Sequence, residues 1–250
     1  MRYFNLIKNL SNWWIYLAIK FGIYNADPIL FRTRKGLLVE VPQRLLQTFK
    51  EIFMDECYMD GLELHVPDNS TVIDIGANTG FFTLFAASRF NCSKILAYEP
   101  IPSNFKQLAR NRGLNADCSM ECFQKAVAGH SGTVEMMFNP DDSFTTSATI
   151  FQKSHKNNQV IRVPSITLSD IFREHSIEMC DLLKMDCEGA EYDIIYSCPS
   201  DCLSRITQMA MEVHGGVEPR QNIESLEAYL NEQGFTTRRR PVGMLWAWKK

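Results

Sequence analysis

The sequence predicts an α/β domain built around a mainly parallel sheet, and three observations support this fold class. From about residue 70 onward, short β-branched runs alternate with segments of helical periodicity, a pattern typical of βαβ units. A glycine turn, Gly76 to Gly80, follows the first of these runs. The 250 residues are 45% hydrophobic and 22% charged, enough to bury one substantial core. We therefore expect one domain over residues 51–250, preceded by a helical appendage over residues 1–50.

The expected elements follow in chain order. Strands are predicted over residues 70–75, 94–98, 122–127, 181–185 and 206–213, with an added strand or hairpin at 132–138. Helices are predicted over residues 79–90, from Pro102 onward, and over 168–175, 190–196 and 222–231. Residues 235–239 and 244–248 are expected to form an antiparallel hairpin. The polar segment 139–158 predicts a long loop, of which residues 141–149 could cover an acceptor.

The N-terminal segment is apolar and aromatic but does not predict a membrane span. Lys8 and Lys20 interrupt it, and its longest apolar stretch, from Trp13 to Ile19, is far shorter than the roughly 20 residues that a bilayer needs. No cleavable signal is predicted either. Six side chains recur at helical spacing and predict one apolar helix face: Tyr3, Ile7, Leu10, Trp14, Leu17 and Phe21. This face would pack on its own domain or a second subunit, or lie in a membrane interface.

Composition excludes several other classes of protein. The formal net charge of −3 provides no general attraction for nucleic acid. The eight cysteines are too sparse for a disulfide scaffold, and two C-x-x-x-C pairs, Cys118/Cys122 and Cys198/Cys202, lack the spacing of zinc motifs. We expect reduced thiols, no bound metal and no nucleic-acid partner.

The glycine turn after the first strand is the main candidate for a ligand site. Parallel α/β sheets bind nucleotide-like ligands at the carboxyl ends of their strands. The dinucleotide fingerprint requires glycine at three positions that Gly76, Asn78 and Phe81 occupy here, so two of its three glycines are missing. Asp74, at the base of the turn, would repel a pyrophosphate and favour the ammonium group of S-adenosylmethionine. A nicotinamide-dependent oxidoreductase is therefore disfavoured.

Glu99 ends the next strand, 19 residues after Gly80. An acidic side chain at this position can accept hydrogen bonds from both hydroxyls of an unphosphorylated ribose. Together, the carboxylates and the turn predict a cofactor site formed by Asp74, Gly76, Asn78, Gly80 and Glu99.

Three segments resemble FkbM-type methyltransferases: Asp74-Ile-Gly-Ala-Asn-Thr-Gly-Phe-Phe-Thr83, Tyr98-Glu-Pro100 and Lys184-Met-Asp-Cys-Glu-Gly-Ala-Glu191. The resemblance extends from about Phe53 onward and implies the class I methyltransferase fold, a Rossmann-like three-layer sandwich with a seven-stranded sheet. It also implies an S-adenosylmethionine cofactor and, usually, O-methylation of natural-product or sugar hydroxyls. Glu56-Cys57-Tyr58 is similar to the family segment ahead of the first motif, so Tyr58 would cover the cofactor or, equally well, be a core residue.

Methylation of a hydroxyl requires a group that removes its proton as the new bond forms. Two strand ends at the carboxyl edge offer candidates for this catalytic chemistry: Lys184, Asp186, Glu188 and His214. His214 ordinarily titrates near neutrality, and neighbouring carboxylates would favour proton uptake by Asp186. Two alternatives remain: a structural ion network joining Lys184 to Glu188 or Glu212, and a hard cation such as Mg²⁺ held by Asp186, Glu188 and Glu212.

The sequence thus predicts an S-adenosylmethionine-dependent methyltransferase that methylates a hydroxyl on a saccharide or secondary metabolite. We expect it in the cytoplasm, either free or associated with the membrane surface. Its partner would be a small-molecule or glycan acceptor, with membrane contact or homo-oligomerisation through the N-terminal helix. N-methylation of an amine is the alternative within the same enzyme class. A membrane-associated binding module that has the fold but no turnover is the alternative outside it.

Overall fold

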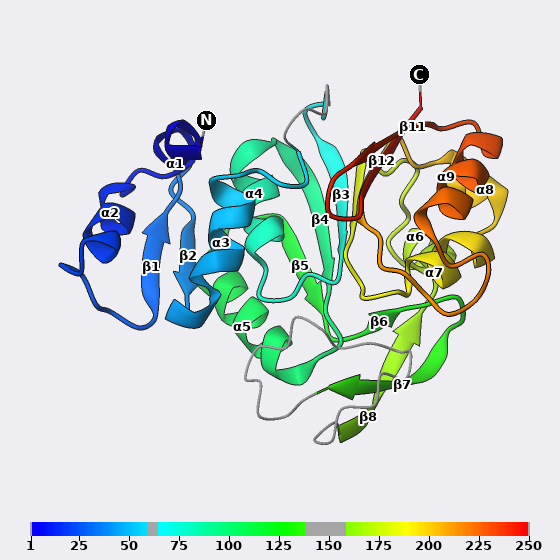
Figure 1. Ribbon diagram of the computed structural model, residues 1–250, viewed down its shortest axis with the longest axis horizontal. Helices are drawn as coiled ribbons and strands as arrows, with labels where there is room; N and C mark the ends of the chain where they lie inside the picture. The colour runs from blue at the N-terminus through cyan, green and yellow to red at the C-terminus, as the bar shows by residue number, and fades with distance from the viewer. Residues whose placement is uncertain (1, 60–64, 139–158, 250) are drawn as a thin grey trace.

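The computed structural model describes residues 2–59, 65–138 and 159–249 and contains a seven-stranded sheet between two layers of helices (Figure 1). The strand order is β11-β12-β10-β9-β3-β4-β5. The strands are β3 (Ser70–Ile75), β4 (Cys92–Tyr98), β5 (Met120–Phe123), β9 (Leu182–Met185), β10 (Gln208–Glu212), β11 (Thr236–Arg240) and β12 (Met244–Trp248). Within this sheet only β12 runs against its neighbours, and it forms the expected hairpin with β11. The predicted fold class is confirmed.

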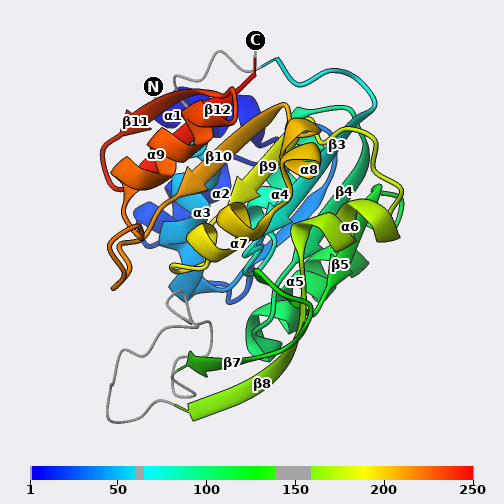
Figure 2. The same cartoon turned by 90° about the vertical axis from the view of Figure 1, so that its right-hand side faces the viewer.

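Helices cover both faces of the sheet (Figure 2). One layer contains α3 (Leu46–Phe53), α4 (Phe81–Arg89) and α5 (Pro102–Gly113), and the other contains α6 (Leu168–Glu174), α7 (Glu191–Ser197), α8 (Ser200–Ser204) and α9 (Ile223–Glu232). Because both faces are covered, β9 is buried at all four positions, as parallel strands in such sheets usually are. Polar side chains start two of the helices: the Thr167 hydroxyl accepts from the Asp170 N–H, and the Asn222 amide accepts from the Ser225 N–H.

The N-terminal segment is not the single helix that its periodicity predicted. It forms α1 (Arg2–Asn9) and α2 (Trp14–Lys20), then a hairpin of β1 (Ile29–Arg32) and β2 (Leu38–Val41), and a 3₁₀ turn (Gln43–Leu45). The chain leaves the helix at Leu10 because this residue pairs with Thr33 beside β1, and the Asn12 side chain bonds the backbone of β1. The break changes the helical phase, so the predicted apolar face is wrong: Tyr3, Ile7, Trp14 and Phe21 are exposed, whereas Leu10 is buried.

The appendage shares its core with the sheet domain. Phe31 of β1 stacks on Phe49 of α3 with ring centroids 4.4 Å apart, and Phe49 in turn contacts Phe53 and Phe81. The Trp246 ring of β12 belongs to the same buried cluster. The hydrophobic core therefore continues from the appendage into one face of the sheet, and α3 joins the two parts.

A second, three-stranded sheet lies below the carboxyl edge of the main sheet (Figure 1). It consists of β6 (Ala126–Val127), β7 (Gly132–Phe138) and β8 (Gln159–Ile166). The predicted third strand is therefore wrong in extent, because β5 ends at Phe123 and β6 pairs with β8 instead. The proposed acceptor lid at residues 141–149 lies outside the described residues.

Candidate active site

The loop after β3 is fixed between the two strands that flank β3. The N–H groups of Gly76 and Ala77 both donate to the Tyr98 carbonyl at 3.0 Å, and the Asp186 N–H donates to the Ile75 carbonyl at 3.1 Å. Gly76 has a φ of +70°, and a Cβ atom built on it would lie 1.8 Å from the Asp186 carbonyl oxygen. Only glycine fits here, because both the backbone conformation and the contact exclude a side chain. Gly80, the turn's other glycine, also has a positive φ, +85°.

Replacing Gly76 with alanine should therefore displace the loop and destabilise the protein by about 2–4 kcal/mol. Urea unfolding measures this loss. Gly113→Ala is the matched control, because nothing lies within 4 Å of a Cβ atom there and its φ is not in the left-handed region. That variant should unfold near the wild-type midpoint, and equal losses in both variants would mean that the contact with Asp186 has no special importance.

Asp74 does not face a ligand as the sequence led us to expect. Its side chain has an exposure of 0%, Oδ1 lies 3.2 Å from Lys184 Nζ, and Oδ2 accepts a hydrogen bond from the Thr83 hydroxyl at 2.6 Å. The chain itself therefore supplies the cation that we assigned to a cofactor. The reason is that Asp74 and Lys184 are register partners on the adjacent parallel strands β3 and β9, so their side chains lie side by side.

Lys184 supports the glycine turn through a buried ion pair, and its predicted catalytic role stays a prediction. It is almost completely buried and donates to the Gly76 carbonyl at 2.8 Å, so the Asp74–Lys184 pair supports the turn from below. Burial alone would lower the pKa of Lys184, but the charges of Asp74 and Asp186 outweigh it and the pKa is raised. Lys184 is therefore a permanent cation at neutral pH. The sequence predicted Glu188 or Glu212 as the partner of Lys184, whereas the structure pairs Lys184 with Asp74.

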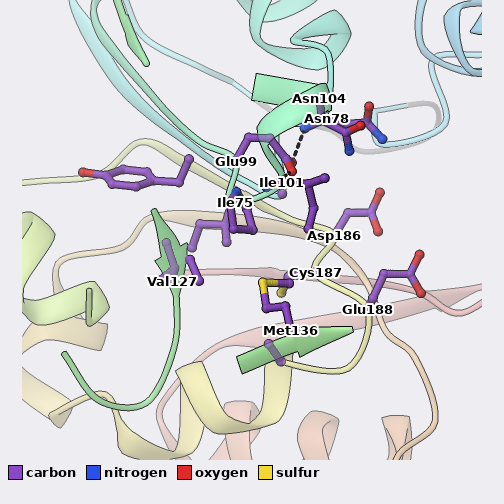
Figure 3. A pocket seen from close by; sticks show the side chains of 15 residues that line it. Ile75, Asn78, Glu99, Ile101, Asn104, Val127, Met136, Asp186, Cys187 and Glu188 are labelled. Carbon is purple, nitrogen blue, oxygen red and sulfur yellow. Dashed lines mark hydrogen bonds between the residues drawn. The ribbon is translucent and has the colours of Figure 1, made fainter. Parts of the chain in front are cut away.

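Glu99 occupies the position expected for a ribose-binding carboxylate. Its two oxygens accept from the N–H groups of Asn78 and Ile101, each at 2.8 Å (Figure 3). Burial raises the pKa of Glu99 to about 7, against the effect of these two hydrogen bonds. The ionised carboxylate therefore has unused acceptor capacity in a poorly solvated place, which favours a ligand that donates hydroxyl groups.

A first cavity opens at this edge of the sheet, between the loops after β3, β4 and β9. Glu99 and Asn78 lie on one side of it, and Cys187 and Met136 on the other (Figure 3). The buried Asn78 Oδ1 atom has no hydrogen-bond partner. Such an orphaned acceptor is expected where a ligand supplies the missing donor. The first cavity has a volume of about 60 Å³, and its hydrogen-bonding groups suit the hydroxyls of an unphosphorylated ribose.

Several residues of this cavity were not anticipated from the sequence. Ile101, Asn104, Met136 and Cys187 all line it. Asn104 could have been found from its place in the first turn of α5, directly after the Glu99 strand end. Met136 could not, because it belongs to the second sheet and no local pattern relates β7 to the glycine turn.

A second cavity, of about 430 Å³, adjoins the first and is rich in carboxylates. The two cavities share Gly76, Asn78, Asp186 and Glu188. Four acidic residues line the second cavity: Glu51, Asp186, Glu188 and Glu212. An acceptor in the second cavity would therefore meet a ligand in the first at Asp186 and Glu188.

Tyr58 is part of this second cavity rather than of the first. Its hydroxyl donates to Asp186 Oδ2 at 2.7 Å, and its ring packs edge-on against Phe82. Burial and the charge of Asp186 raise the pKa of Tyr58 well above its ordinary value. The residue is thus buried and acts as a neutral donor that orients Asp186.

The surroundings of His214 favour its protonated form and move its pKa away from the neutral range that the sequence predicted. Burial lowers the pKa of His214, but the hydrogen bond between Nδ1 and Glu191 Oε1, 3.1 Å long, and nearby carboxylate charges raise it to about 9. Its Nε2 atom lies 3.7 Å from Glu188 and 4.0 Å from Glu212. A protonated imidazole cannot accept a proton, which argues against His214 as the base at neutral pH.

Glu188 has the properties that we had assigned to His214. Partial burial raises its pKa to about 7, although the charge of His214 acts in the opposite direction. A general base works best when its pKa lies near the working pH. Glu188 lines both cavities. It is therefore the carboxylate best placed to accept a proton from a group bound where the two cavities meet.

The same cluster also contains potential metal ligands. Donor atoms of Asp186, Glu188 and His214 lie within 4.8 Å of one another. His214 replaces Glu212 in the oxygen-only set that the sequence suggested. A cation bound there would have to displace the imidazolium proton, because a metal binds only the neutral ring. The prediction that no metal is used remains a prediction.

Comparison with known proteins identifies the family. Residues 74–237 match the model of the methyltransferase FkbM domain, so the chain belongs to this family of S-adenosylmethionine-dependent methyltransferases. Methyltransferase sdnD of Sordaria araneosa is 27% identical over 216 residues, covering 75% of this chain and 80% of the relative. The 31-O-demethyl-FK506 methyltransferase FkbM of Streptomyces tacrolimicus is 27% identical over 215 residues, with 75% and 80% coverage.

A solved structure supports the fold. The crystal structure of methyltransferase FkbM from Methylobacillus flagellatus superposes with a TM-score of 0.54 at 13% sequence identity, over 82% of this chain. The chain spans about half of that protein, 54% of its length. The resemblance inferred from the sequence motifs is thus confirmed at the level of family and fold.

Proposed function

We propose that the protein transfers a methyl group from S-adenosylmethionine, bound in the first cavity, to a hydroxyl group in the second. The observation that carries this proposal is the junction of the two cavities at Gly76, Asn78, Asp186 and Glu188. The cofactor, when bound, supplies an electrophilic methyl group. Glu99 would accept the ribose hydroxyls, and the orphaned Asn78 Oδ1 atom would accept a further donor. Asp74 and Lys184 would hold the glycine turn in place.

The chain's own residues would position the acceptor and take its proton. Methyl transfer is an in-line displacement, so holding the acceptor oxygen in line is a large part of catalysis. Asp186, fixed by the Tyr58 hydroxyl, would accept a hydrogen bond from the acceptor. Glu188 would take the hydroxyl proton, and the charge of the neighbouring His214 opposes the effect of burial, so that the pKa of Glu188 is about 7.

The walls of the second cavity favour a neutral polyhydroxy acceptor over an anionic one. Four carboxylates line this cavity against one cation, Lys184, so they would repel a phosphate or carboxylate but accept hydrogen bonds from several hydroxyl groups. This supports a saccharide or a hydroxylated secondary metabolite. The Streptomyces tacrolimicus relative is named as a 31-O-demethyl-FK506 methyltransferase, which describes methylation at an oxygen. The same carboxylates favour a cationic amine, which makes N-methylation the second candidate.

The experiment is transfer of a radiolabelled methyl group from S-adenosylmethionine to panels of neutral sugars, polyketide alcohols, amines and sugar phosphates. The proposal expects label in a neutral polyol, lost in Glu188→Gln and kept in Glu218→Gln, a matched change at an exposed glutamate. Label confined to amines would establish the second candidate. Label found only in anionic acceptors would contradict the assignment of the carboxylate-lined cavity.

A further inference from the structure

The N-terminal end of the molecule exposes an unusual number of large apolar side chains. Of the twelve that are exposed within the described residues, seven lie between residues 3 and 30. Six of these define what we call the aromatic face: Tyr3, Phe4, Ile7, Trp14, Phe21 and Ile23. Their exposures run from 43% for Ile7 to 80% for Ile23. Concentrated apolar exposure of this kind marks an interaction surface.

Helix α1 presents its apolar side to the outside and part of its polar side to the interior. Asn5 and Asn9 are buried, and their amides donate to the carbonyls of Met54 and Phe53 at 3.0 and 2.8 Å. Tyr3, Phe4 and Ile7, at spacings of one, three and four, occupy the opposite side of the helix. The buried amides fix this rotation, so the aromatic face is a built feature rather than a frayed end.

Helix α2 continues the same surface. The Lys20 ammonium donates to the Tyr3 hydroxyl at 2.7 Å, and the rings of Tyr3 and Tyr16 lie 6.5 Å apart, so the two helices are neighbours. Trp14 and Phe21 are seven residues apart and share one side of α2 and its C-terminal turn. Both helices lie at one end of the molecule (Figure 1).

Charge distinguishes this end from the rest of the chain. Residues 1–50 contain eight Lys and Arg against two Asp and Glu, a formal charge of +6, whereas residues 51–250 contain 18 against 27, a formal charge of −9. Arg2 and Lys8 pair with Asp55 and Glu56. Arg34 and Lys35 instead donate to the neutral carbonyls of Ile7 and Phe90, so these contacts leave their positive charge unneutralised.

We propose that the aromatic face docks on the surface of an anionic phospholipid bilayer. Exposed aromatic and aliphatic side chains beside basic ones are the composition of helices that lie in a membrane interface, and basic residues near a surface are attracted to anionic lipids. A symmetric contact with a second copy would bring the cations beside this face, Lys20 and Arg34, towards their own copies, which disfavours that occupant. The acidic remainder of the chain would orient away from the lipid.

This contact lies on the membrane and does not cross it. Helices α1 and α2 have eight and seven residues. Among the residues that the structure describes, no helix is long and apolar enough to span a bilayer.

The test is co-sedimentation of the full chain with phosphatidylcholine vesicles and with vesicles that also contain 40% phosphatidylglycerol. The test variant is Phe4→Glu/Phe21→Glu, whose positions are 69% and 70% exposed. The matched control is Val217→Glu/Val242→Glu, at positions that are 82% and 85% exposed. Both variants add the same charge at exposed sites, and circular dichroism and light scattering verify their folding and mass.

We expect the wild type to bind the anionic vesicles, to bind pure phosphatidylcholine at least tenfold more weakly, and to be released by 0.5 M salt. Phe4→Glu/Phe21→Glu should weaken binding tenfold or more, and the control should change it less than threefold. Two results would overturn the proposal: equal binding by both variants, or a wild-type dimer that does not sediment with vesicles and becomes monomeric in Phe4→Glu/Phe21→Glu. The second result would establish the face as a subunit interface.

Discussion

Replacing Asp74 with asparagine is expected to destabilise the protein by about 3–5 kcal/mol, because it leaves a buried ammonium without its counter-charge. The side chains of Asp74 and Lys184 are 0% and 4% exposed, and their charged atoms are 3.2 Å apart. Lys184 would keep the carbonyl oxygens of Ile75 and Gly76 and the charge of Asp186, but would lose the carboxylate 3.2 Å away. Urea unfolding at pH 7 measures the loss directly.

A double variant separates the charge effect from simple disturbance of the site. In Asp74→Asn/Lys184→Met the ammonium is absent, so most of the stability lost in Asp74→Asn should return. If the double variant is less stable than Asp74→Asn alone, the ion pair is not the cause of the loss. A cost below about 1 kcal/mol for Asp74→Asn would show that water reaches Lys184, contrary to its burial.

Replacing Glu188 with glutamine should lower kcat by about 10² to 10⁴, the usual contribution of a general base. Glutamine keeps the size and hydrogen-bonding capacity of the side chain but cannot accept the proton. Turnover with the acceptor found in the labelling screen provides the measurement, and Glu218→Gln should behave as the wild type. Retention of more than half of the wild-type kcat would move the role of base to Asp186.

The pH dependence of kcat/KM for the acceptor, at saturating cofactor, follows from the same residues. Glu188 must be ionised to act as a base, so activity should rise as pH increases through its pKa of about 7. His214 loses its proton only near its pKa of about 9, where Glu188 is already ionised, so activity should stay level through that pH. In His214→Gln the acid rise should move to higher pH, because the cation lowers the pKa of Glu188.

Local sequence patterns predicted most of the central sheet because its strands are buried on both faces. The apolar, β-branched run from Ser70 to Ile75 and the glycine turn after it are typical of a buried strand followed by a helix, and the structure has both. The position of Glu99 in the fold was predicted for the same reason. It directly follows the last residue of β4, and the carboxyl ends of parallel strands lie at one edge of the sheet. The boundary of α4 differed by two residues at its start, where Gly80 adopts the left-handed conformation.

Pairings between distant segments could not be predicted in this way. Asp74 and Lys184 are neighbours only because β3 and β9 are adjacent in the sheet, and the spacing along the chain gives no sign of this. The charge state of His214 likewise depends on Glu191, which the start of α7 buries beside it. The β1–β2 hairpin was missed although its signal was present: short apolar runs at residues 29–31 and 37–39 flank the turn at Gly36.

The measurement that tests the central claim most directly is isothermal titration of the purified protein with S-adenosylmethionine and S-adenosylhomocysteine. The structure predicts micromolar binding by the wild type, at least tenfold weaker binding (about 1.4 kcal/mol) by Glu99→Ala, and unchanged binding by Glu121→Ala, which alters an exposed glutamate of β5. Binding should also weaken as pH falls through 7, because burial raises the pKa of Glu99 to about 7 and the protonated carboxyl accepts fewer hydrogen bonds. Folded protein that gives no heat at millimolar cofactor would contradict the assignment of the first cavity.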